Sequence, residues 1–60
     1  MTTIDAVMII ETASPEDYTA DEYRAAWQYL YDIGIVWELQ GWYGRTAINL
    51  LESGFITPKE

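Results

Sequence analysis

The chain has no cysteine and no histidine among its 60 residues, and only Arg24, Arg45 and Lys59 are basic. The missing cysteines exclude disulfide bonds, and without thiolates and imidazoles the ligands that transition metals bind best are gone. Two serines, Ser14 and Ser53, have no histidine that could activate them as nucleophiles. We therefore expect no enzyme activity, no metal site and no cofactor.

Positive charge and long apolar runs are also scarce. Ten acidic residues give a net charge of −7, which repels the phosphate backbone of nucleic acids and anionic lipid surfaces. The longest uninterrupted apolar run, Ala6–Ile10, is too short to cross a bilayer. We expect neither direct nucleic-acid binding nor a membrane partner.

Aromatic residues, in contrast, are plentiful, with three Trp, five Tyr and one Phe in a chain that is 50% hydrophobic. This composition is typical of a folded protein, and the length fits a single domain over residues 1–60. A core this small usually needs a further source of stability. With disulfides and common metal sites excluded, we expect a homodimer.

The first two predicted elements are helices. Residues 4–11 are interpreted as a short helix, although the apolar, β-favouring stretch Val7–Ile10 leaves a buried strand as the alternative. Thr19 and Glu22 have the spacing of a capping box, which opens a second helix over residues 20–33. That helix carries one apolar stripe, formed by Tyr23, Ala26, Trp27 and Leu30.

A third helix is predicted over residues 36–53. Gly34 before it and Gly54 after it each suit a left-handed helix C-cap. Its main apolar stripe should meet the second helix, and it consists of Val36, Leu39, Trp42, Tyr43, Thr46, Ala47 and Leu50. The expected fold is therefore all-α, with a short N-terminal helix packed on an antiparallel helical hairpin.

The third helix has a second face that sets it apart from an ordinary packing helix. Trp37, Gly41, Gly44 and Ile48 recur at the spacing of one helical stripe, and Arg45 borders it. Glycine inside a helix costs about 1 kcal/mol relative to alanine, so its use indicates close approach of another surface. Three alternatives stay open: the first helix covers the two glycines, another protein chain covers them, or the glycines break the helix.

These five residues, Trp37, Gly41, Gly44, Arg45 and Ile48, are the candidate partner-binding site. Tryptophan and arginine are enriched at the centres of protein interfaces. The competing interpretation of Arg45 is an ion pair within the chain, with Glu38 or with the acidic loop before the second helix. Trp42 and Tyr43 are expected in the core.

Five acids within twelve residues form an acidic segment, Glu11, Glu16, Asp17, Asp21 and Glu22. Such a segment could imitate the phosphates of DNA and occupy the basic cleft of a DNA-binding protein. The simpler interpretation is a solvated loop with acids placed at the positive end of the second helix.

The segment Leu39–Ala47, with the pattern LQG, two aromatics, GR, T and A, resembles the core signature of a family of short proteins encoded by tailed bacteriophages. No activity is attached to that family. The resemblance implies a phage accessory protein made in the bacterial host cytoplasm. By analogy of setting, it would bind a host protein and inhibit host function or defence, with an acidic DNA mimic or a self-assembling structural phage component as alternatives.

Overall fold

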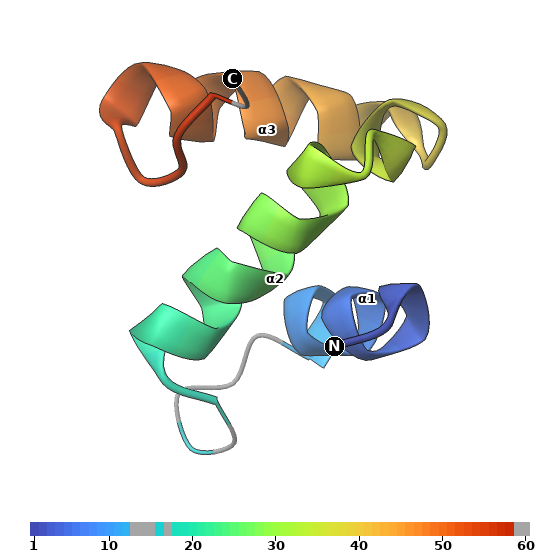
Figure 1. Ribbon diagram of the computed structural model, residues 1–60, viewed down its shortest axis with the longest axis vertical. Coiled ribbons are helices and arrows are strands. Elements are labelled where there is room, and N and C mark those ends of the chain that lie inside the picture. Colours follow the sequence, from blue (N-terminus) through green and yellow to red (C-terminus); the bar gives the residue numbers. More distant parts are fainter. Residues whose placement is uncertain (13–15, 17, 59–60) are drawn as a thin grey trace.

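The computed structural model describes residues 1–12, 16 and 18–58 and is helical throughout its regular parts. Its elements are α1 (Thr3–Thr12), α2 (Ala20–Asp32), a 3₁₀ turn η1 (Ile35–Trp37) and α3 (Gly41–Ser53), with no strand among the described residues. The all-α fold class is confirmed, and residues 4–11 are helix and not strand. Figure 1 shows α2 running obliquely between α1 and α3, so the chain reverses after α2 but α3 crosses that helix at a slant.

Helix α1 begins at Thr3, one residue before the predicted range 4–11, and Thr2 caps it. The backbone N–H of Asp5 donates to Thr2 Oγ1 at 3.2 Å, and that of Ala6 donates to the Thr2 carbonyl at 3.0 Å. Thr2 therefore satisfies amide groups that the first turn of a helix leaves without partners. One side of α1 buries Ala6, Ile9 and Ile10, and the helix packs against α2.

Helix α2 opens with the predicted capping box. The Glu22 amide donates to Thr19 Oγ1 and the Thr19 amide donates to Glu22 Oε1, both at 3.1 Å. The helix ends at Asp32, and Gly34 follows with the left-handed φ of +81° that its assignment as a C-cap glycine required. Ala26, Trp27 and Leu30 of the predicted stripe are buried.

The predicted third helix over residues 36–53 is wrong in its first turn. Residues 35–37 form η1, Gln40 is extended at ψ 149°, and α3 begins only at Gly41. In a continuous helix Trp37 and Gly44 would stand about 10 Å apart along the axis. The break instead folds Trp37 back onto Gly44, and this packing replaces one turn of helix.

The core contains only hydrophobic and tyrosine side chains, and none of the described polar or charged residues is buried in it. Trp27 lies at its centre, fully buried among the rings of Tyr23, Trp42 and Tyr43, with ring centroids 5.6 to 6.5 Å away. The buried residues come from every helix, from η1 and from the tail: Ala6, Ile9, Ile10, Ala26, Trp27, Leu30, Val36, Tyr43, Ala47 and Ile56.

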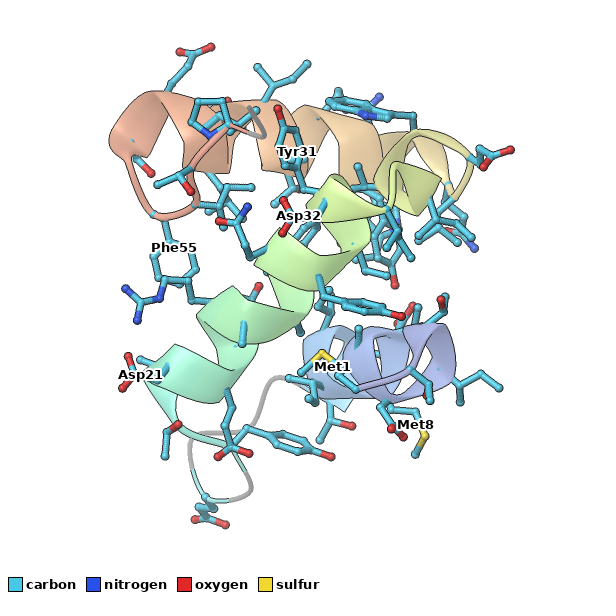
Figure 2. All side chains as sticks on the ribbon, viewed as in Figure 1. Met1, Met8, Asp21, Tyr31, Asp32 and Phe55 are labelled. Carbon is cyan, nitrogen blue, oxygen red and sulfur yellow. The ribbon has the colours of Figure 1, made fainter. Side chains whose placement is uncertain are left out.

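The tail after α3 folds back onto α2. Gly54 ends α3 with φ +83°, as predicted, and Ile56 is buried in the core. Phe55 extends from the end of α3 toward α2 (Figure 2), where its ring lies 6.1 Å from that of Tyr23. Thr57 is fixed to α2 by two hydrogen bonds with the side chain of Gln28. The Thr57 N–H donates to Gln28 Oε1 at 2.8 Å, and Gln28 Nε2 donates to the Thr57 carbonyl at 2.9 Å.

Candidate functional site

Trp37 and Gly44 form the centre of the candidate site. A Cβ atom on Gly44 would lie 3.4 Å from Cε3 of the Trp37 ring, which is ordinary contact distance, so the indole packs directly against α3 at this glycine. Trp37 also contacts Tyr31 of α2. The two rings meet edge to face, with their centroids 6.2 Å apart. The break before α3 therefore brings together the two residues that the sequence placed on one stripe.

Arg45 and Gly41 extend this surface toward the start of α3. The Arg45 guanidinium passes Gly41, with Nη1 3.7 Å from the position that a Cβ there would take. The ion pair with Glu38 that the competing interpretation required is not formed, and the one ion pair among the described residues joins Arg24 to Asp21. Within that part of the chain Arg45 has no acidic partner, so its guanidinium can accept a carboxylate of another molecule as its partner.

Ile48 completes the surface, one turn after Gly44. Trp37 is 51% exposed and Ile48 is 46% exposed, although both are large apolar side chains. We call this surface the α3 face, and it consists of Trp37, Gly41, Gly44, Arg45 and Ile48. The structure thus brings all five predicted site residues onto one side of η1 and α3.

Helix α1 does not cover the α3 face. This excludes the alternative, left open by the sequence, that the first helix covers Gly41 and Gly44. Helix α1 packs on α2 and meets the inner side of α3 through the Tyr43–Glu11 hydrogen bond, and none of its atoms lies within 4 Å of a Cβ placed on Gly41 or Gly44. Gly44 is covered by Trp37 of the same chain instead. The outward side of Trp37, together with Ile48 and Arg45, stays open to solvent.

Tyr43 and Trp42 occupy the inner side of α3 to different degrees. Tyr43 is buried, and its hydroxyl donates to Glu11 Oε1 at 2.9 Å, which joins α3 to α1. Burial, with the hydrogen bond and negative charge of Glu11, raises the pKa of Tyr43 to about 12. Trp42 contacts Tyr43 with ring centroids 4.0 Å apart, and its Nε1 donates to Gln40 Oε1. It is 37% exposed and lies outside the core cluster, so the prediction that Trp42 is a core residue is wrong.

Two residues with long-range roles could not be found from the sequence. Glu11 anchors Tyr43 across 32 positions, and Gln28 anchors Thr57 across 29 positions. Each is a polar residue on a helix, and nothing in its local neighbourhood distinguishes it from a solvated one. Only the arrangement of the helices gives these side chains their partners.

The acidic segment is largely engaged within the chain. Glu11 binds Tyr43, Glu22 completes the capping box and Asp21 pairs with Arg24 at 3.0 Å, while Asp17 lies outside the described residues. The described residues contain no group of three or more potential metal-ligating side chains. Within that same part of the chain, no helix has the length and apolar character needed to cross a bilayer.

The fold and the α3 face together define a small all-α protein with an exposed surface of apolar side chains beside Arg45, which has no ion-pair partner among the described residues. The chain belongs to the family described as "Domain of unknown function (DUF7417)", whose model matches residues 3–60. Comparisons with curated proteins and with solved structures give no match.

Proposed function

We propose that this protein is a non-enzymatic binding domain and that its α3 face docks onto another protein. The observation that carries the proposal is the unpaired Arg45 beside the exposed Trp37 and Ile48. Interface centres combine aromatic and arginine anchors in this way. The complementary surface would offer an apolar pocket for Trp37 and Ile48 and a carboxylate for the Arg45 fork.

The partner in this proposal is a host protein in the bacterial cytoplasm, and the consequence of binding is inhibition of a host function or defence. The support is the resemblance of Leu39–Ala47 to the signature of short phage proteins. Three of the five site residues, Gly41, Gly44 and Arg45, lie within that signature.

Affinity capture from bacterial lysate tests the site with two matched arginine variants. Arg45→Ala and Arg24→Ala remove the same charge from exposed positions on different helices. We expect a partner captured by the unaltered protein to be lost with Arg45→Ala and kept with Arg24→Ala. Equal capture by both variants, measured by quantitative mass spectrometry, would exclude the α3 face as the site.

The DNA-mimic alternative uses a different set of residues and is separated by one further variant. In a chain with Asp21→Asn and Glu22→Gln the acidic segment is weakened while the α3 face is unchanged. Loss of capture only in this double variant would replace our proposal by mimicry. The intramolecular roles of Asp21 and Glu22 argue against that outcome.

A homodimer remains part of the proposal, because a domain of this size has a small core. Sedimentation equilibrium at high micromolar concentration measures the mass directly. A dimer that Ile48→Gln dissociates would place the second copy on the α3 face. A monomer at that concentration would remove self-association from the proposal and leave docking to another protein unaffected.

A further inference from the structure

Helix α1 carries apolar side chains on two opposite sides, and the described part of the chain covers only one of them. Ala6, Ile9 and Ile10 face the core, whereas Ile4 is 72% exposed and Met8 is 55% exposed. Figure 2 shows Met8 pointing away from both α2 and α3. Ile4 and Met8 lie one helical turn apart, and large apolar side chains exposed together on one side of a helix mark a surface that a partner can cover.

The open side borders a hollow of about 340 Å³. Its lining comes from the chain start, from α1 and from the segment that precedes α2, and comprises Met1, Asp5, Met8, Ile9 and Tyr18. This volume lies near the lower end of the range for pockets that hold ligands, which suits one or two apolar side chains of a docking segment. Methionine side chains adapt to the shape of what they contact. We call the surface formed by Met1, Ile4, Asp5 and Met8 the α1 face.

Charge identifies the kind of partner that this surface fits. Helix α1 carries Asp5 and Glu11 and no basic residue, within a chain of net charge −7. A second copy of the chain would set like charges against one another. It would also have to bury about 800 Å² per protomer for a stable dimer, roughly a fifth of the 4075 Å² surface, and ten residues of helix supply only three turns.

We infer that the α1 face binds an amphipathic helix of another protein, one that presents apolar side chains flanked by lysine or arginine. Its apolar residues would enter the hollow beside Met8 and Ile9, and its basic residues would face Asp5 and the negative field of the chain. This site is separate from the α3 face and does not depend on the function proposed for that face.

Synthetic peptides test the chemistry of the partner. The probe is an amphipathic Leu/Lys helix of about four turns, and its controls are a Leu/Glu helix of the same pattern and a Lys/Gln helix that lacks apolar residues. We expect micromolar binding of the Leu/Lys peptide alone by calorimetry, with the largest amide shift changes in a ¹⁵N spectrum at α1. Equal binding of either control peptide, or shift changes centred on α3, would overturn the inference.

Two variants locate the binding on the protein. Ile4→Gln with Met8→Gln alters the α1 face, and Ile33→Gln removes a similarly exposed apolar side chain that belongs to neither the α1 face nor the α3 face. We expect roughly tenfold weaker binding in the first variant and unchanged binding in the second. Equal weakening in both would overturn the inference, as would a dimer of the unaltered protein that only the first variant dissociates. All three positions are exposed, so circular dichroism should report retained helix in both variants.

Discussion

Tyr43 and Gly44 are neighbours in α3 that serve opposite sides of the molecule. The Tyr43 side chain enters the core and reaches Glu11 of α1, whereas Gly44 faces outward beneath Trp37. One residue step thus separates the contact that joins α3 to α1 from the surface proposed for binding. Substitutions at these two positions should have different consequences for stability.

Replacing Tyr43 by Phe should lower the free energy of unfolding by about 1 kcal/mol at neutral pH, because Glu11 loses its hydrogen-bond donor. The pKa of Tyr43 is raised to about 12 in the folded protein, above the ordinary value of 10. Between these pH values the unfolded chain has released the proton and the folded chain has kept it. The contribution of Tyr43 to the free energy of unfolding is therefore fully present below pH 10. It falls as the pH rises toward 12, by at most about 1.4 kcal/mol per pH unit.

Urea denaturation across the alkaline range measures this effect, with the Tyr43→Phe variant as the reference. The other tyrosines are common to both proteins, so the difference between the two curves isolates Tyr43. The difference should shrink above pH 10 and reverse sign as the pH approaches 12, because a fall of about 1.4 kcal/mol per pH unit soon exceeds the roughly 1 kcal/mol of the hydrogen bond. Parallel curves up to about pH 12 would show that the buried hydroxyl does not hold its proton.

The glycines divide into two classes that alanine substitution should separate. Gly44→Ala should stabilise the protein by up to about 1 kcal/mol, because a Cβ at 3.4 Å from the Trp37 ring makes ordinary contact and alanine favours helix. Gly34→Ala should destabilise it by about 1 kcal/mol, since φ +81° is strained for any residue with a Cβ. Thermal unfolding of the two variants should move in opposite directions, and a shift of the same sign in both would contradict this division.

At the scale of elements, the parts fixed by neighbours in sequence could be predicted. The capping box of Thr19 and Glu22, the left-handed Gly34 and Gly54, and the buried stripe of α2 all follow from local patterns. The break before α3 could not be predicted, because Glu38, Leu39 and Gln40 are good helix formers. It depends on Trp37 meeting Gly44 and Tyr31, a contact that exists only after the chain has folded.

The candidate site shows the same division. Spacing along an ideal helix selected Trp37, Gly41, Gly44, Arg45 and Ile48, and these residues do share one face. The spacing implied that all five residues lie on one continuous helix. Trp37 instead belongs to η1 and reaches this face by folding back onto Gly44. Sequence reasoning also could not decide between an ion pair and a free Arg45, because that depends on where the carboxylates lie in space.

The tail should behave as an integral part of the helical packing. Ile56→Ala should reduce the free energy of unfolding by about 2 to 4 kcal/mol, because the side chain is only 1% exposed and belongs to the hydrophobic core. Ile33→Ala is the matched control, and at an exposed position it should change stability by less than about 0.5 kcal/mol. Urea denaturation midpoints of the two variants provide the comparison. If the tail only lay on the surface, Ile56→Ala would lower the free energy of unfolding as little as Ile33→Ala does.

At the scale of the whole molecule, charge is unbalanced. Ten acids and three bases share a body of 30 × 22 × 20 Å, and the one ion pair among the described residues is exposed. An exposed pair of this kind contributes little. Repulsion among the acids therefore outweighs attraction between opposite charges.

Salt should consequently stabilise the protein. At about 0.01 M ionic strength the Debye length is roughly 30 Å, which equals the longest dimension of the molecule, and at about 0.15 M it is roughly 8 Å. Adding sodium chloride over this range screens the repulsion and should raise the thermal midpoint. A lower midpoint at higher salt would mean that attractive ion pairs dominate after all.

The three tryptophans of the chain occupy three different environments, being 0% (Trp27), 37% (Trp42) and 51% (Trp37) exposed. Trp27 is also the residue whose buried ring N–H has no hydrogen-bond partner among the described residues. An indole without polar neighbours emits at short wavelength, whereas one in water emits at longer wavelength and is open to quenching by acrylamide. The molecule thus contains two intrinsic fluorescent probes, Trp27 in its core and Trp37 on the α3 face. A ligand that covers Trp37 would shift the emission to shorter wavelength and reduce quenching by acrylamide, so binding could be followed in unlabelled protein.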